Sequence, residues 1–197
     1  MKRSWLGLAV LAIVLATVAC GKPPQGDIDA AHAAMNDAQA MAEKWAPTEW
    51  QTAQSGLSAA QAELDAQNQK WFKNYDKAKE LLAQAKSDAE AAKTAATANL
   101  ETAKNEATTA IADATAAMEA AKTALAGAPK GKDTKADLAL FQQDLDGMTV
   151  TMTEATAAMQ SEDYTTARDK ANSIKEKAMS ISDQIAQAAA KKAGGRK

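Results

Sequence analysis

Apolar and small residues recur along most of the chain in alternating steps of three and four, and polar or charged residues fill the positions between them. This mean spacing of 3.5 residues keeps the apolar positions on one side of a helix and predicts left-handed supercoiling. Five segments carry the pattern: Ile28 to Trp45, Trp50 to Trp71, Tyr75 to Ala124, Leu138 to Met159 and Tyr164 to Ala188. The sequence therefore predicts an all-α protein.

Residues that start and stop helices separate these segments. Pro47, followed by Glu49, comes directly after Ala46 and predicts the start of the second helix, because proline is tolerated in the first turn. The third segment contains neither Gly nor Pro up to Ala126, which predicts one long helix. The stretch Gly127-Ala128-Pro129-Lys130-Gly131-Lys132-Asp133 then predicts a turn.

The composition indicates how these helices pack. Ala accounts for 51 of the 197 residues, and residues 20–197 contain only 29 larger apolar side chains. Small core residues let helix backbones approach closely, which favours antiparallel neighbours joined by short loops. We therefore expect Ala-rich antiparallel coiled-coil helices in two three-helix bundles, residues 27–98 and 99–193, that share one long central helix.

The two halves of the chain resemble each other weakly. The segment Asn74-Tyr75-Asp76-Lys77-Ala78 aligns with Asp163-Tyr164-Thr165-Thr166-Ala167 at an offset of 89 residues. Trp50, Leu57 and Leu64 align with Leu138, Leu145 and Met152 at an offset of 88. A duplication would produce these matches, and so would an Ala-rich composition alone.

The N-terminal segment has the features of a secretion signal. Lys2 and Arg3 precede an apolar run from Trp5 to Ala19, which ends at the only Cys of the chain. At 15 residues the run is shorter than the roughly 20 needed to span a bilayer, although a spanning anchor is the alternative. We expect a signal peptide over residues 1–19 and a tether over residues 20–26.

The end of this segment, Thr17-Val18-Ala19-Cys20, resembles the bacterial lipoprotein box. The resemblance implies that Cys20 becomes the acylated N-terminus and anchors the protein in a membrane. Gly21, where an Asp would retain such a protein in the inner membrane, implies an outer-membrane location facing the periplasm. The mature chain would carry 21 basic residues (23 less Lys2 and Arg3) against 25 acidic ones.

Two further segments resemble known envelope proteins. The run Trp45-Ala46-Pro47-Thr48-Glu49-Trp50, followed by Asn74-Tyr75-Asp76-Lys77-Ala78, is similar to an uncharacterised family of Ala-rich bacterial envelope lipoproteins. The resemblance covers about residues 27 to 110 and implies a periplasmic helical module without a known enzymatic role.

The C-terminal residues Arg196-Lys197 are similar to the end of the major peptidoglycan-linked outer-membrane lipoprotein. By this resemblance Lys197 would be the attachment residue, and residues 194–197 would form a flexible basic tail. The alternative is a frayed basic helix end, since basic residues are favoured there in any case.

The residue types exclude several chemistries. One Cys and one His rule out a disulfide scaffold and a structural zinc site. A net charge of -2, with acids and bases interleaved, gives no basic stripe for nucleic acid. His32 lies off the core positions and is expected at the surface. Since no catalytic or phosphate-binding motif is present, we expect neither an enzyme nor a cofactor or metal site.

One short segment suggests contact with lipid. Lys70-Trp71-Phe72-Lys73-Asn74-Tyr75 should join the second and third helices at the anchored end, and aromatic rings beside lysines favour a bilayer interface. Trp71 and Tyr75 fall on core positions and could instead cap the bundle. Phe72 and, second to it, Trp71 are the candidate membrane-contact residues.

Two functions fit these expectations, a structural or scaffolding lipoprotein of the bacterial cell envelope and a lipid-anchored helical adaptor for a protein partner. In both, Cys20 supplies the membrane anchor. A structural rod needs only this anchor and its shape, with the cell wall as a candidate partner, whereas an adaptor needs a protein partner. Asn99 falls on a core position near the boundary of the two predicted bundles, where a buried Asn could fix the register of the helices, unless Leu100 takes that place.

Overall fold

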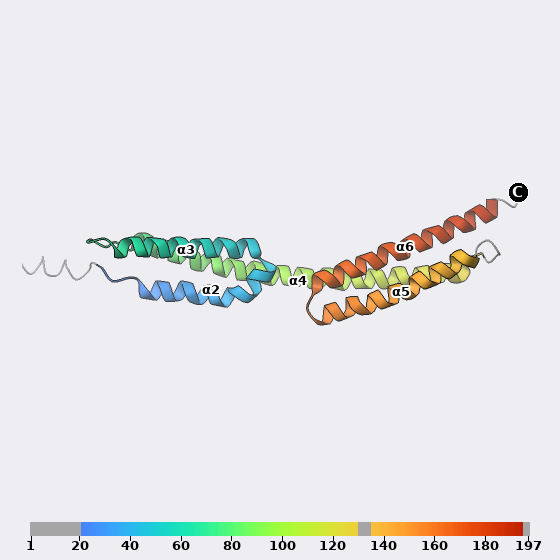
Figure 1. Cartoon of the computed structure of the whole chain (residues 1–197), viewed down its shortest axis with the longest axis horizontal. Helices are drawn as coiled ribbons and strands as arrows, with labels where there is room; N and C mark the ends of the chain where they lie inside the picture. The colour runs from blue at the N-terminus through green and yellow to red at the C-terminus, as the bar shows by residue number, and fades with distance from the viewer. Residues whose placement is uncertain (1–20, 130–134, 195–197) are drawn as a thin grey trace, which may run out of the picture. The chain divides into compact units, whose positions relative to one another are not determined.

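The computed structural model describes residues 21–129 and 135–194. The predicted signal peptide, Cys20 and Lys197 lie outside these ranges. The described chain is all-α, without strands, as the sequence predicts. Its five helices, shown in Figure 1, are α2 (Gln25–Trp45), α3 (Pro47–Asn68), α4 (Asp76–Gly127), α5 (Lys135–Gln160) and α6 (Tyr164–Gly194).

The helix boundaries follow from local chemistry. Pro47 occupies the first turn of α3, as predicted, and only Ala46 separates α3 from α2. Between α5 and α6 the backbone of Glu162 adopts φ 59°, a left-handed conformation common after a helix end. The Asp163 carboxylate then accepts a hydrogen bond from the Thr166 N–H at 3.3 Å, which caps the start of α6.

Contacts divide the chain into two compact units, with the boundary between Leu100 and Glu101 inside α4. In the first unit α2, α3 and the first part of α4 share two buried clusters. One cluster joins Met35, Ala38, Ala42, Ala46, Trp50, Ala53, Ala89, Ala92 and Ala96. The other joins Ala31, Ala60, Leu64, Tyr75, Ala78 and Leu82. Early residues of α2 therefore meet late residues of α3, so these two helices run in opposite directions.

Polar contacts in the first unit show that α2 and α4 run in the same direction. The Lys93 ammonium lies 2.6 Å from the Asp37 carboxylate. Further along both helices, the Asn99 side-chain amide donates a hydrogen bond to the Trp45 carbonyl oxygen at 2.7 Å. Asn99 therefore caps the last residue of α2.

The second unit is built from the rest of α4 with α5 and α6. Its largest fully buried side chains, Leu145 and Ile174, belong to one cluster with Met118, Met148, Ile181 and Ile185. Two ion pairs join α4 to α6, Glu106 with Arg168 at 2.9 Å and Asp113 with Lys175 at 2.8 Å. The residues of the second pair follow those of the first by seven positions on each helix, as expected for parallel helices with a heptad repeat.

Burial confirms most of the predicted core positions and corrects three of them, Asn99, Ala188 and Trp71, the last of which is described with the turn below. Tyr75 is 6% exposed, and the small residues at Ala78, Ala85, Ala89, Ala92 and Ala96 are fully buried. Asn99 is exposed rather than in the core, because its amide turns to the end of α2. Ala188, predicted in the core of α6, is also exposed, since it lies beside an open cavity described below.

Candidate membrane-contact site

The turn between α3 and α4, residues 69–75, carries the most exposed large apolar side chains that the structure describes. Trp71 is 92% exposed and Phe72 is 81% exposed. The exposure of Phe72 confirms that it lies outside the core. The placement of Trp71 on a core position was wrong, because α3 ends at Asn68 and the heptad spacing does not continue into the turn.

Hydrogen bonds hold both ends of this turn in place. The side chain of Gln67, which is 7% exposed, donates to the Glu63 carboxylate at 2.6 Å and accepts from the Asn74 backbone N–H at 3.3 Å. The Asn74 side chain in turn accepts from the Asp76 N–H at 2.8 Å and so caps α4. Gln67 is therefore buried because it ties the end of α3 to the start of α4.

Tyr75 fixes the turn against the bundle. Its ring lies in the buried cluster with Leu64 and Leu82, and its hydroxyl donates to the Asn68 side chain at 2.6 Å. This arrangement satisfies the polar tip of a buried tyrosine. Trp71 and Phe72 are therefore exposed on a fixed turn whose flanking residues are packed and hydrogen-bonded.

The beginning of the described chain lies beside the same turn. A Cβ atom built on Gly21 would be 3.9 Å from Cδ of Lys73, so the backbone of Gly21 is next to the Lys73 side chain. Gly21 has φ +123°, a conformation that side-chain-bearing residues rarely adopt. Since Gly21 follows Cys20 in the sequence, the predicted acylation site is one residue from this contact.

Three lysines lie close to the exposed rings in the sequence or beside the Gly21–Lys73 contact. Lys22 and Lys70 are exposed, and Lys73 is partly exposed. Within residues 21–129 and 135–194, none of the three has a carboxylate within 4.0 Å, whereas six lysines elsewhere do. The site therefore combines protruding aromatic rings with unpaired ammonium groups.

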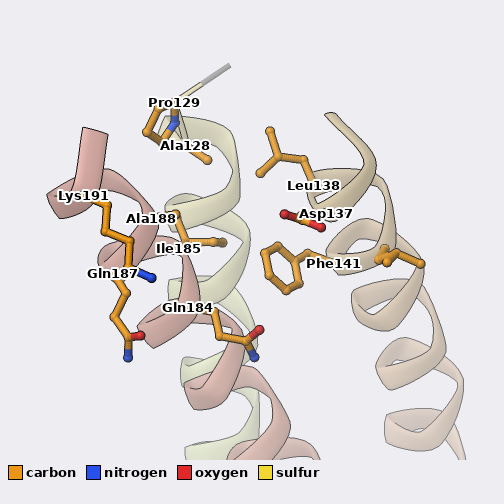
Figure 2. A pocket seen from close by; sticks show the side chains of 11 residues that line it. Ala128, Pro129, Asp137, Leu138, Phe141, Gln184, Ile185, Gln187, Ala188 and Lys191 are labelled. Carbon is orange, nitrogen blue, oxygen red and sulfur yellow. The ribbon is translucent and has the colours of Figure 1, made fainter. Parts of the chain in front are cut away.

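A second surface feature lies at the start of α5 and the end of α6. A half-open cavity of about 400 Å³ is lined by Leu138 and Phe141 on one side and by Ile185 and Ala188 on the other. Figure 2 shows Phe141 pointing across the cavity toward Ile185. Asp137 and Lys191 lie among its polar residues. The heptad pattern missed this cavity because it assigned Leu138, Phe141 and Ala188 to a closed core.

His32 is exposed, as predicted. Among the residues that the structure describes, no three His, Cys, Asp or Glu side chains are grouped to hold a metal ion. No helix in the described ranges has the length and apolar character needed to cross a membrane. No protein-family model, curated protein or solved structure matches this chain.

Proposed function

We propose that this chain is a membrane-anchored structural or scaffolding lipoprotein of the bacterial cell envelope, without enzymatic activity. In this proposal Cys20 is acylated after removal of residues 1–19, and the helical part faces the periplasm from the outer membrane. The fold is proposed to be two three-helix bundles that share α4, with the antiparallel supercoiled packing expected of Ala-rich helices.

The observation that supports this proposal best is the position of Gly21 beside Lys73. A lipid on Cys20 would enter the bilayer next to the turn that exposes Trp71 and Phe72. Aromatic rings and lysines favour the interface between headgroups and acyl chains, so the anchor and the turn would meet the same membrane. Several acyl chains on one residue give stable anchoring, whereas a single chain is marginal.

The anchoring is tested by expressing the full chain in a bacterium with two membranes. Mass spectrometry of the N-terminal peptide should show a peptide that begins at Cys20 and carries acyl chains. The Cys20→Ala variant should leave the membrane fraction and retain its helical circular dichroism. Recovery of wild-type protein with an unmodified Cys20 would refute the proposal.

A link between Lys197 and the cell wall belongs to the structural proposal as a separate step. Sacculi boiled in detergent would be digested with lysozyme, and the released material probed for the tagged chain. Release of wild-type protein but not of the Lys197→Ala variant supports the link. If no protein is released in either case, the link between Lys197 and the cell wall is refuted.

The second candidate is a lipid-anchored adaptor that binds a protein partner, and the cavity of Figure 2 favours it. Leu140, one of the residues lining this cavity, is 58% exposed, so apolar surface is available to a partner. Crosslinking in cells, followed by pull-down from detergent extracts, separates the candidates. The adaptor would be favoured if one stoichiometric partner is recovered with the wild type and with Phe72→Ser but is lost with Leu140→Ser.

A further inference from the structure

We infer that the α3–α4 turn selects anionic lipid headgroups: Lys22, Lys70 and Lys73 contact the headgroups while the rings of Trp71 and Phe72 enter the interface. This inference rests on the proposed membrane anchoring and adds the chemistry of the lipid. It concerns the tip of the first unit, defined as residues 21–26 and 66–75.

The charge of the tip is opposite in sign to that of the chain. The whole chain has a formal net charge of -2, whereas the tip contains three lysines and no carboxylate. The nearest carboxylates along the chain are Asp27 and Asp76, each in the first turn of a helix, and Asp65, whose carboxylate accepts a hydrogen bond from the Gln61 side chain at 3.1 Å. Backbone N–H groups at helix N-termini partly balance the charges of the first two. The tip therefore presents positive charge toward whatever it faces.

The tip differs from the helices because its lysines are grouped without a carboxylate among them. Six lysines along the described helices meet carboxylates either one turn away, as Lys77 meets Glu80 at 3.2 Å, or on a neighbouring helix, as Lys93 meets Asp37 at 2.6 Å. Other lysines of the described helices, such as Lys104 and Lys177, form no such pair with a described residue but have carboxylates close by in the sequence. The three tip lysines have no such partner within 4.0 Å among the described residues. The three tip lysines are therefore placed to bind an anion from outside the chain.

The combination of side chains at the tip favours a bilayer. Trp71 and Phe72 are adjacent in sequence and protrude, with exposures of 92% and 81%. Aromatic rings beside lysines suit the interface of a bilayer, where the rings bury their apolar surface and the amines reach the headgroups. Gly21, which follows the predicted anchor residue Cys20 in the sequence, lies against Lys73 at the same tip, so an anchored chain would bring this tip to the membrane.

The test uses the chain from residue 20 onward with Cys20→Ser, so that no lipid tethers it. Binding is measured by flotation with vesicles of phosphatidylcholine alone, and with vesicles containing about one third phosphatidylglycerol. The wild-type tip should bind the anionic vesicles more tightly, and added salt should reduce the difference. The double variant Lys70→Gln/Lys73→Gln should lose about 30-fold in affinity for anionic vesicles, since each lysine near such a surface contributes about fivefold.

Two control variants separate the effect of the tip on vesicle binding from the effects of net charge and of exposed apolar surface. The double variant Lys104→Gln/Lys177→Gln removes two exposed lysines that also lack a described carboxylate partner, and it should bind as the wild type does. Leu140→Ser removes an exposed apolar side chain outside the tip and should also leave binding unchanged. Thermal unfolding should confirm that all variants fold alike.

Each outcome decides something different. Equal binding to both kinds of vesicle would overturn the selectivity. Equal losses in the tip and control lysine variants would assign the effect to net charge and overturn the inference. No binding to either vesicle would overturn contact by the tip, whereas the proposed anchoring would fail only if Cys20 of the full chain proved unmodified. Loss of a crosslinked protein in the tip variants, with vesicle binding unchanged, would replace the lipid by a protein.

Discussion

Replacing Asn99 by Ala tests the observation that this residue caps α2. In the native chain its side-chain amide donates to the Trp45 carbonyl at 2.7 Å, although Asn99 itself is exposed on α4. The last carbonyls of a helix have no partner within the helix, and this bond supplies one for Trp45. A buried core Asn, by contrast, would be destabilising, and Asn99→Leu would then stabilise the fold.

The expected effect of Asn99→Ala is the sum of two opposing contributions. Loss of the hydrogen bond should cost about 1 kcal/mol of unfolding free energy. Ala is a better helix former than Asn, which returns about 0.5 kcal/mol. The net destabilisation should therefore be about 0.5 kcal/mol, too small to interpret without a matched control.

Asn105 provides that control, because it is exposed on the same helix and its side chain makes no hydrogen bond within the described ranges. Asn105→Ala should stabilise the protein by about 0.5 kcal/mol through helix propensity alone. Urea denaturation followed by circular dichroism should then show a difference of about 1 kcal/mol between the two variants. If both variants change the stability equally, the bond between Asn99 and Trp45 contributes nothing and the capping role is wrong.

Three further predictions concern the packing. A Cβ on Gly56 would meet Ala85 at 3.6 Å, an ordinary contact, and one on Gly147 would meet no atom within 4 Å. Both Gly→Ala changes should therefore raise the free energy of unfolding in urea by about 1 kcal/mol each. A loss of stability at Gly56 alone would mean that α3 and α4 need the closer approach. Trp50 is 6% exposed, and its indole N–H has no hydrogen-bond partner among the described residues. Trp50→Ala should therefore lower the free energy of unfolding by about 3–5 kcal/mol, measured by thermal unfolding. Trp50→Phe should lower it by less, because no hydrogen bond of the indole is lost, and equal losses would contradict this. Lys175→Gln should lower the free energy of unfolding by at most about 1 kcal/mol, because the ion pair of Lys175 with Asp113 is solvent-exposed. This loss should become smaller at high salt, and a loss that salt leaves unchanged would contradict an exposed pair.

The helices and most core positions could be predicted because they depend on local signals. Proline in a first turn, the absence of Gly and Pro over some fifty residues, and a small or apolar residue every 3.5 positions are properties of the sequence itself. The observed start of α3 at Pro47 and the end of α4 at Gly127 agree with these signals.

The errors occur where burial depends on a neighbouring helix. Asn99 lies level with the end of α2, so beyond Trp45 the first unit offers α4 no further residues of that helix to pack against. Trp71 lies past the end of α3, where the backbone no longer follows a helical period. A heptad count assumes a partner at every position, and it cannot show where the partner ends.

The contacts that define the candidate site could not be predicted from the sequence, for a related reason. Lys73 meets Gly21 from a position 52 residues away, and only the folding of α2 and α3 brings them together. The spacing of three and four residues includes Gln67, between Leu64 and Trp71, but the role of Gln67 in tying Asn74 to the end of α3 depends on how the turn folds. The residue types predicted an interfacial segment, and the structure shows how that segment is held.

The energetics of the tip indicate that the acyl chains of the anchor hold the protein on the membrane and that the turn orients it. A large aromatic side chain buries about 150–250 Å² when covered, worth about 4–6 kcal/mol at 25 cal/mol per Å². Half-immersion of Trp71 and Phe72 would therefore give about 5 kcal/mol, close to the marginal, reversible binding of one myristoyl chain. Such a contribution cannot retain a protein on a membrane, but it suffices to orient one that acyl chains already hold. Because the turn is braced by Tyr75 and Gln67, this orientation would be transmitted to the helices of the first unit.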